Sequence, residues 1–444
     1  MNQALFSYIA ASPTAFQAVA HTAKLLEEKN YRPLRETEEW TLEPGGRYYV
    51  TRNGSSLIAF RLPKGRPGGF MMTAAHSDSP TFKIKENAEL AGESDTRLSV
   101  EGYGGMLCAS WMDRPLSIAG RAMVRTEKGI AMRLVDLKDV AAGIPNVAIH
   151  MNREMNKGVE YNPQVDLLPL LADVSFDEYD AHTTYDAQTA SENAEEQPEA
   201  VEKPTLVALA AETAGVDAET ILGEDLFLYT RQEGKMIGAK GEFVLSPRLD
   251  DLQSAFALTK AFTESTPAEY INVCAVFDNE EVGSGTRQGA DSTFLEDILQ
   301  RIAEGLQADH SSYLRWVADS FLISADNAHA VHPNHPEKAD PTNRPYLNGG
   351  IVIKYHGSQK YTTDGISAAR MKDYCERAKV PYQTYANRSD IAGGSTLGNI
   401  STAHVSVSSV DIGLPQLAMH SAVETAGMKD TEYAVRALKE FWGE

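Results

Sequence analysis

The chain has 444 residues, a formal net charge of −21 and a pI near 5.0. This acidic balance argues against nucleic acid and anionic membranes as partners, because both repel a negatively charged surface. No apolar run approaches the length of a membrane span, and the N-terminus lacks a signal-peptide pattern, so we expect a cytoplasmic protein. The three widely spaced cysteines are typical of reduced core thiols rather than of a disulfide framework.

The chain is long for one hydrophobic core, so we expect two domains. Its first and last parts alternate short apolar strands with helical stretches, such as residues 15–29 and 366–378, which is typical of an α/β sheet covered by helices. We predict that residues 1–89 and 238–444 form this α/β domain and that residues 90–237 form an inserted β-rich domain. Strands of the insert are predicted over residues 97–100, 116–124, 130–135 and 147–151.

One segment of the predicted insert differs in composition from the rest. Residues 173–203 are acidic, polar and poor in aliphatic side chains, so we expect a flexible, solvated loop there. The residues that follow, 206–214 and 216–222, resemble a helical pair.

Titratable residues follow predicted buried segments at several places along the chain. His76 and Asp78 come after the apolar residues 69–75 and lie on the same side of the extended chain. If His76 binds a metal ion, Asp78 can approach its imidazole ring and fix the tautomer without itself contacting the metal. Asp250 opens onto a predicted helix at residues 252–258, and a carboxylate there can bridge two cations.

Two adjacent glutamates, Glu280 and Glu281, follow the apolar residues 271–277 and lead into a glycine-containing turn at residues 283–285. Neighbouring carboxylates converge on one site only where a strand breaks into a loop, and the glycines supply that break. Such a pair suits chemistry in which one carboxylate holds a metal and the other moves protons of an activated water. Pairs of glutamates are also common on solvated surfaces, so this pair indicates a metal site only together with other candidate ligands.

Two more strand ends complete the pattern. Asp326 follows the apolar residues 321–325, and His420 follows residues 414–419. Histidines and carboxylates at strand ends are an apt ligand set for a pair of Zn²⁺, Mn²⁺ or Co²⁺ ions. A single histidine after an apolar run is more often structural, but the order and setting of all these residues together favour a metal site.

Five blocks of the sequence, taken in order, resemble the motifs of the aspartyl aminopeptidase family of dinuclear zinc exopeptidases. The resemblance covers essentially the whole chain, and it implies a three-layer α/β/α catalytic domain with an inserted β-rich dimerisation domain. The blocks are TAAHSDSP at 73–80, PRLD at 247–250, DNEEVGSG at 278–285, SADNAHAVHPN at 324–334 and PQLAMHS at 415–421.

The resemblance implies two divalent metal ions, with Zn²⁺ favoured and Mn²⁺ or Co²⁺ as alternatives. One ion would be held by His76 and Asp326, and the other by Glu281 and His420. Asp250 would bridge the two ions.

Further roles follow from the same resemblance. Glu280 would be the general base, and Asp78 would orient the first histidine ligand. His150 would reach the active site of a neighbouring subunit and stabilise the oxyanion there, although it could instead end a strand at the dimer surface. Lys354 would select an acidic substrate side chain, although an edge-strand lysine facing water fits the sequence almost as well. His329 would line the substrate pocket.

The sequence departs from the family pattern at two places. Asp251 stands after the bridging acid where asparagine is usual, and Ile391-Ala392 replaces the usual Met-Pro. Asp251 could alter the charge around the metals. His332 and His335 lie close to Asp326 in the sequence and could be mistaken for a zinc-binding cluster. The adjacent prolines prevent a continuous helix that would bring the two histidines to one face.

The expected reaction is removal of the N-terminal residue, preferably Asp or Glu, from short peptides by a homo-oligomer built from dimers, with a dodecamer as one form. Within the enzymes, the alternative is a broader aminopeptidase that prefers Leu or Met. A different class of alternative is a non-catalytic oligomeric scaffold that binds partners through the acidic loop. The Glu280 base argues against the scaffold, because a non-catalytic protein has no need of it.

Overall fold

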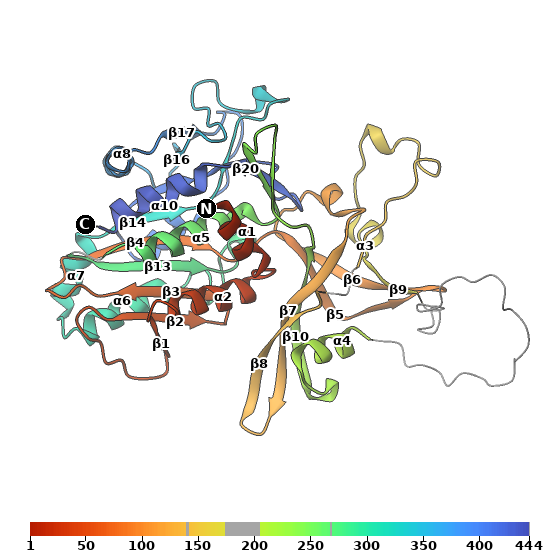
Figure 1. Ribbon diagram of the computed structural model, residues 1–444, viewed down its shortest axis with the longest axis horizontal. Helices are drawn as coiled ribbons and strands as arrows, with labels where there is room; N and C mark the ends of the chain where they lie inside the picture. Colours follow the sequence, from red (N-terminus) through yellow and green to blue (C-terminus); the bar gives the residue numbers. More distant parts are fainter. Residues whose placement is uncertain (139–141, 174–204, 267–268, 444) are drawn as a thin grey trace, which may run out of the picture. The chain divides into compact units, whose positions relative to one another are not determined.

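The computed structural model describes residues 1–138, 142–173, 205–266 and 269–443. It divides into two compact units, shown in Figure 1. Unit 1 comprises Met1–Thr81, Tyr103–Leu107 and Gln232–Glu444, and unit 2 comprises Phe82–Gly102 and Cys108–Arg231. The predicted acidic loop at 173–203 lies, apart from its first residue, outside the described residues.

Unit 1 is built around a nine-stranded sheet of order β1-β2-β3-β13-β4-β14-β18-β16-β17. Its strands β13, β4, β14 and β18 are mutually parallel, and β4, β13 and β14 are buried along their whole length. Strands buried on both faces need continuous apolar runs, which is why these segments were recognisable in the sequence. The strands are β1 Arg32–Leu34, β2 Arg47–Arg52, β3 Ser56–Arg61, β4 Phe70–His76, β13 Ile271–Phe277, β14 Phe321–Ala325, β16 Ile351–Tyr355, β17 Tyr382–Ala386 and β18 Ser408–Gly413.

Helices cover both faces of this sheet, and alternate residues of its strands face two separate hydrophobic clusters. On β4, for example, Met71 packs in the cluster with Leu258, whereas Met72 packs in the cluster with Ile298. The predicted α/β fold with three layers is thus confirmed for this unit. Its helices are α1 Asn2–Ala10, α2 Ala15–Glu27, α5 Leu249–Glu264, α6 Phe294–Gly305, α7 His310–Ala318, α8 Gly365–Ala378, α9 Leu397–His404 and α10 Asp430–Phe441.

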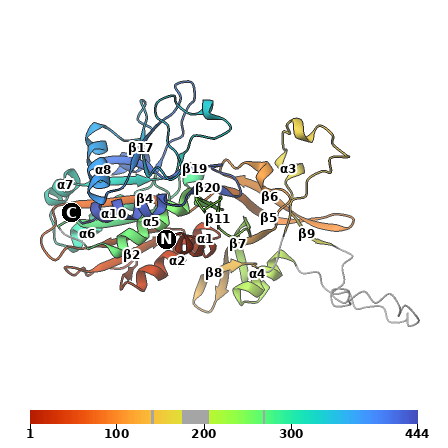
Figure 2. The same ribbon diagram turned by 45° about the horizontal axis from the view of Figure 1, so that its top comes forward.

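A second, smaller sheet of unit 1 has the order β11-β12-β20-β19-β15. Strand β20 therefore pairs with β12 on one side and with β19 on the other, and Figure 2 shows β19 and β20 side by side. The strands are β11 Lys235–Ile237, β12 Phe243–Ser246, β15 Ala328–His329, β19 Pro415–Leu417 and β20 Glu424–Gly427.

Unit 2 contains a six-stranded sheet of order β8-β7-β10-β5-β6-β9, with helices α3 Pro163–Asp166 and α4 Leu206–Ala214. The strands predicted at 97–100, 116–124 and 130–135 lie within β6, β7 and β8, so the β-rich character of this region is confirmed. The strands are β5 Thr81–Ala91, β6 Asp95–Tyr103, β7 Leu116–Thr126, β8 Gly129–Asp136, β9 Leu170–Asp173 and β10 Ile221–Thr230.

Two sequence predictions for unit 2 are wrong. Residues 147–151 form no strand, because the N–H groups of Met151 and Asn152 both bond to the carbonyl of Ala148 in a local turn. Residues 216–222 form no second helix. Gly215, with φ +66°, ends α4, and only a 3₁₀ turn at Ala218–Thr220 precedes the pairing of β10 with β7.

No helix in the described ranges is long and apolar enough to cross a membrane.

Candidate active site

Three parallel strands deliver titratable residues to one edge of the large sheet. Strand β4 ends with His76, β13 is followed by Asp278 and the two glutamates, and β14 is followed by Asp326. Because the strands are parallel and adjacent, their carboxyl ends meet, and Phe277 lies directly opposite His76 in the β13–β4 register. This is the edge at which open α/β sheets usually bind their ligands.

The small sheet contributes the other two predicted ligands through its loops. Asp250 follows β12 by a short connection, and His420 lies in the turn between β19 and β20. Asp250 is almost fully buried, and His420 is half-buried.

The carboxylate of Asp250 lies between the two histidines. His76 Nε2 is 3.6 Å from Asp250 Oδ1, and His420 Nε2 is 3.4 Å from Asp250 Oδ2. His420 Nε2 is also 3.4 Å from Glu281 Oε2. Ligand atoms about 2.0–2.2 Å from one tetrahedral Zn²⁺ are about 3.3–3.6 Å apart, so these separations suit pairs of ligands on a common ion. Each oxygen of Asp250 thus faces a different histidine.

Both histidine rings are held through Nδ1. His76 Nδ1 is 3.0 Å from the carbonyl oxygen of Asp78, and His420 Nδ1 is 3.1 Å from that of Gly105. A carbonyl oxygen can only accept, so in the neutral ring the proton sits on Nδ1. The lone pair of Nε2 then faces Asp250, as a metal ligand requires.

Asp78 holds the turn of the glutamate pair as well as His76. Its Oδ1 accepts from the backbone N–H of Glu280 at 3.2 Å, and its Oδ2 accepts from that of Glu281 at 3.1 Å. Tyr103, which the sequence did not single out, donates its hydroxyl to Asp78 Oδ2 at 2.8 Å. It belongs to a segment remote from every motif, so no local signal could have found it.

The residues present fit a pair of cations. Among the described residues, three groups have ligand atoms close enough to hold an ion: His76 with Asp250 and Asp326, Asp250 with Glu281 and His420, and His76 with Glu280 and Glu281. The first two groups have the same members as the two predicted ligand sets. Asp250 Oδ1 and Glu281 Oε1 are also buried without a hydrogen-bond partner, and a cation would satisfy both.

The electrostatics of these carboxylates also favour cations. Burial raises the pKa of Glu280 to about 8, and the nearby carboxylates of Asp326, Asp78 and Asp250 add to this effect. Burial together with the charge of Asp250 raises the pKa of Glu281 well above its ordinary value. The ionised forms of these buried carboxylates repel one another, and bound cations would relieve that repulsion.

Asp251, the residue that departs from the family pattern, is fully buried beside the site. Its Oδ2 accepts from the backbone N–H of His76 at 3.2 Å, while its Oδ1 has no hydrogen-bond partner. Burial raises the pKa of Asp251 well above its ordinary value, and the carboxylates of Asp326 and Asp250 add to this.

A cavity of about 220 Å³ opens beside these carboxylates. Lys354 and His329, the two residues predicted for the substrate pocket, line it. The ring of His329 lies 6.2 Å from that of Tyr385, which also faces the cavity. Other lining residues are Asp250, Glu280, Glu281, Asp326, Asn327, Ala328, Tyr361, Gly394, Ser395, Thr396, Met419 and His420.

The side chain of Lys354 is only 3% exposed, and its Nζ lies 3.3 Å from Asp326 Oδ2. Strand β16 pairs with a neighbour on both sides, so the alternative of an edge-strand lysine facing water is wrong. Burial disfavours the charged amine, but Asp326, Tyr361 and Asp411 outweigh it and hold the pKa of Lys354 above its ordinary value.

The remaining histidines that the sequence singled out lie on the surface. His150 is exposed in the turn of unit 2 described above, and its predicted role in a neighbouring subunit stays a prediction. His332 and His335 are exposed as well, and His335 Nδ1 lies 3.2 Å from Glu337. Neither belongs to a metal-binding group among the described residues.

Two buried polar residues near the site were missed at the sequence level. Asn327 donates through Nδ2 to the carbonyl of Leu249 and to the side-chain oxygens of Gln253 and Gln416. Glu424 accepts from two backbone N–H groups close to the predicted ligands. Asn327 stands next to a predicted ligand and could have been suspected, whereas Glu424 lies four residues after His420, outside the motif that contains it.

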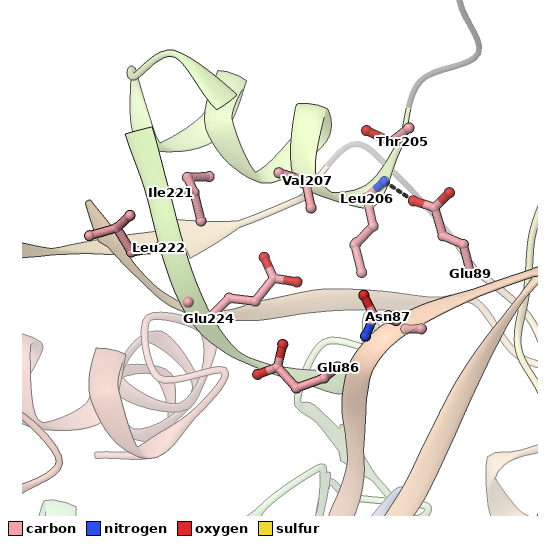
Figure 3. A pocket seen from close by; sticks show the side chains of 11 residues that line it. Glu86, Asn87, Glu89, Thr205, Leu206, Val207, Ile221, Leu222 and Glu224 are labelled. Carbon is pink, nitrogen blue, oxygen red and sulfur yellow. Dashed lines mark hydrogen bonds between the residues drawn. The ribbon is translucent and has the colours of Figure 1, made fainter. Parts of the chain in front are cut away.

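A larger cavity, of about 510 Å³, lies in unit 2 (Figure 3). Glu86, Glu89 and Glu224 line it, and Glu89 accepts a hydrogen bond from the backbone N–H of Leu206 at 2.6 Å. Burial raises the pKa of Glu224, and the charges of the other two glutamates add to this. Among the described residues, no histidine or cysteine lines this cavity, and its glutamates belong to none of the groups that could hold a metal ion.

Comparison with known proteins agrees with this chemistry. The model of the aminopeptidase I zinc metalloprotease family (M18) matches residues 8–442. The chain belongs to the M18 family. The family predicted from the motifs is thus confirmed at the level of M18 zinc aminopeptidases, and the five strand-end blocks all lie within the matched range.

Curated M18 relatives and solved M18 structures align over nearly the whole chain. A probable M18 family aminopeptidase 2 of Clostridium novyi is 43% identical over 99% of this chain and 97% of its own length. One of Pseudomonas aeruginosa is 41% identical over 100% and 98%. Ape4, in its complex with Nbr1, superposes with a TM-score of 0.90 at 34% identity, covering 99% of this chain and 85% of that one. The S. cerevisiae mApe1 dodecamer gives 0.81 at 26% identity, covering 99% and 96%.

Proposed function

We propose that this M18 zinc aminopeptidase uses two metal ions to hydrolyse the first peptide bond of short peptides with an acidic N-terminal residue. The observation that carries the proposal is Asp250, whose two oxygens each face a different histidine within 3.6 Å. A single-metal site has no need of such a bridge.

The ligand sets follow from the contacts around Asp250. One ion would take His76 and Asp326, the other Glu281 and His420, and both would share Asp250. When bound, the ions would polarise the scissile carbonyl and activate a water molecule for attack.

Glu280 is proposed as the general base. Its carboxylate lines the cavity, and Asp78 fixes its backbone N–H, so the side chain is held at the reacting centre. Glu280 would accept a proton from the attacking water and return it to the leaving amine. Positive charge on the two metal ions would keep Glu280 ionised at neutral pH, against the effect of burial.

Lys354 is proposed to select the acidic side chain of the substrate. It is a buried cation on the wall of the cavity, and a carboxylate entering there would gain a charge-assisted hydrogen bond. Its pairing with Asp326 gives Lys354 a second task, which is to hold a metal ligand in place. His329 would contact the substrate from the rim of the same cavity.

The shared-site hypothesis concerns His150, which would stabilise the oxyanion in a neighbouring subunit. Its exposed position in unit 2 leaves it accessible to a second copy. The dodecamer of mApe1 supports a homo-oligomer for the present chain as well. We propose that this oligomer is built from dimers.

A panel of aminoacyl substrates, combined with metal analysis, tests the proposal. We expect two metal ions per chain, higher kcat/KM for N-terminal Asp and Glu than for Leu and Met, and loss of activity after chelation that Zn²⁺, Mn²⁺ or Co²⁺ restores. A preference for Leu or Met would favour the broader aminopeptidase. A metal-loaded protein inactive on every member of the panel would favour a scaffold.

A further inference from the structure

Glu424 is the first residue of β20, the central strand of the small sheet. The strand on one side, β12, leads to Asp250, and the strand on the other side, β19, leads to His420. Glu424 therefore starts its strand between two loops that each carry a predicted metal ligand.

The carboxylate of Glu424 joins these two loops. Its Oε2 accepts from the backbone N–H of Asp250 at 3.0 Å, and its Oε1 accepts from that of His420 at 2.8 Å. Glu424 is 1% exposed, so water cannot replace either bond. Both oxygens are directed to amides, and Glu424 belongs to none of the groups that could hold a metal in the described part of the chain.

Both loops have backbone conformations that need support from outside. Arg248, two residues before Asp250, has φ +52°, and Ala418 and His420 have φ +56° and +66°. Non-glycine residues keep this left-handed conformation only where the surrounding structure holds them in it. A hydrogen-bond acceptor outside each loop supplies such support and fixes the backbone position of each ligand.

We propose that Glu424 is a positioning residue that sets the separation of Asp250 from His420, and thereby the geometry of the metal pair. The inference rests on the proposed ligand assignment. Glu424 touches neither substrate nor metal and acts through the backbone of the two ligands.

A carboxylate suits this position better than an amide does. Both partners are N–H donors, so the side chain must present two acceptors. Glutamine offers one acceptor and one NH₂ group, which would face an N–H group and leave that buried donor without a partner. The change Glu424→Gln therefore keeps the shape of the side chain and breaks one of the two bonds.

The test measures metal binding directly. For Glu424→Gln we expect Zn²⁺ affinity, measured by competition with a chromophoric chelator, to fall roughly 10–100-fold, as for loss of outer partners at other metal sites. The visible spectrum of the Co²⁺-loaded protein should change as well, because the ligand geometry around the ion changes. Glu424→Asp, which keeps the charge but cannot span both amides, should give a smaller loss in the same direction.

Asp430→Asn is the matched control. Asp430 is also a buried acid of unit 1 that accepts from two backbone N–H groups, those of Asn348 at 2.8 Å and Gly350 at 3.0 Å. It is not a member of any metal-binding group. Its variant should lose thermal stability while it keeps the Zn²⁺ affinity and Co²⁺ spectrum of the wild type.

The possible failures are distinguishable. A wild-type protein that binds no metal through these residues would overturn the proposed function itself. A wild type that binds two ions, with Glu424→Gln equal to it in affinity and spectrum, would overturn only the role of Glu424. Should Glu424→Gln not fold, the same criteria apply to Glu424→Asp, and wild-type affinity there would overturn the role.

Discussion

The two units each contain a cavity lined by carboxylates, but the two cavities differ in what surrounds the acids. In unit 1 the acids alternate with His76 and His420 at separations of 3.4–3.6 Å, and they are almost fully buried. In unit 2 the cavity is more than twice as large, but no histidine of the described ranges lines it beside the three glutamates, and Glu89 already accepts a hydrogen bond from the first residue of α4. The spacing of the ligands and the carboxylate that they share therefore indicate a metal centre, whereas the volume of a cavity and the number of acids in it do not.

The largest effect is expected for Asp250→Ala. Removing the carboxylate between the two histidines should release both metal ions and abolish activity, because one side chain serves both ligand sets. Metal content per chain, measured by atomic emission, checks this. The control in the other cavity, Glu224→Ala, should leave metal content unchanged. Equal metal loss from both variants would remove the distinction between the two cavities.

Next comes Glu280→Gln, which should keep the metals and lower kcat by about 10²–10⁴-fold, the usual contribution of a general base. The amide has the shape of the acid but cannot accept the proton. Steady-state kinetics on an aminoacyl substrate, with metal content measured on the same sample, checks this. Near-normal turnover would refute the general-base assignment.

His150→Ala tests whether unit 2 takes part in the chemistry of a neighbouring subunit. Loss of an oxyanion donor should lower kcat about 10²–10³-fold. Co-expression of His150→Ala with Glu280→Gln should restore activity, because each mixed dimer would combine an intact Glu280 with an intact His150 at one site. Mixed dimers that form and stay as inactive as their parents would show that the subunits do not share a site.

Lys354→Ala should alter substrate preference within the unit 1 cavity. A hydrogen bond to a charged group contributes about 1.5–3 kcal/mol, so kcat/KM for N-terminal Asp and Glu should fall roughly 10–100-fold more than for Leu. Metal content must be measured in parallel because Lys354 also pairs with Asp326. An equal loss of kcat/KM on all substrates would show that Lys354 acts through its contact with Asp326 and not through the substrate side chain.

The smallest effect is expected from Glu224→Gln in unit 2. Burial raises the pKa of Glu224 above its ordinary 4.5, so the folded protein binds this proton more tightly than the unfolded chain. The wild type should therefore lose stability relative to the glutamine variant as pH rises above about 4.5, the ordinary value. Thermal melts of both proteins across this pH range measure the difference. A difference in Tm that does not change with pH would contradict the prediction.

The sequence predicted the parts of the fold that depend on local pattern. The apolar runs at β13 and β14 were predicted with the bounds that the structure shows, because strands buried inside a sheet need apolar side chains on both faces. The motifs placed the candidate ligands at strand ends. The segment at 147–151 was apolar too, but it forms a turn held by the carbonyl of Ala148, so an apolar run alone did not specify a strand.

By itself, then, the sequence determined the family, the buried strands β4, β13 and β14 of the central sheet and the residues at their ends. Only the tertiary structure decided that β4, β13 and β14 are neighbours, that Lys354 is buried against Asp326, and that Glu424 joins the loops of Asp250 and His420. The physical reason is the separation of the partners along the chain. Glu424 and Asp250 are 174 residues apart, and no local periodicity records a contact that forms only when distant strands pair.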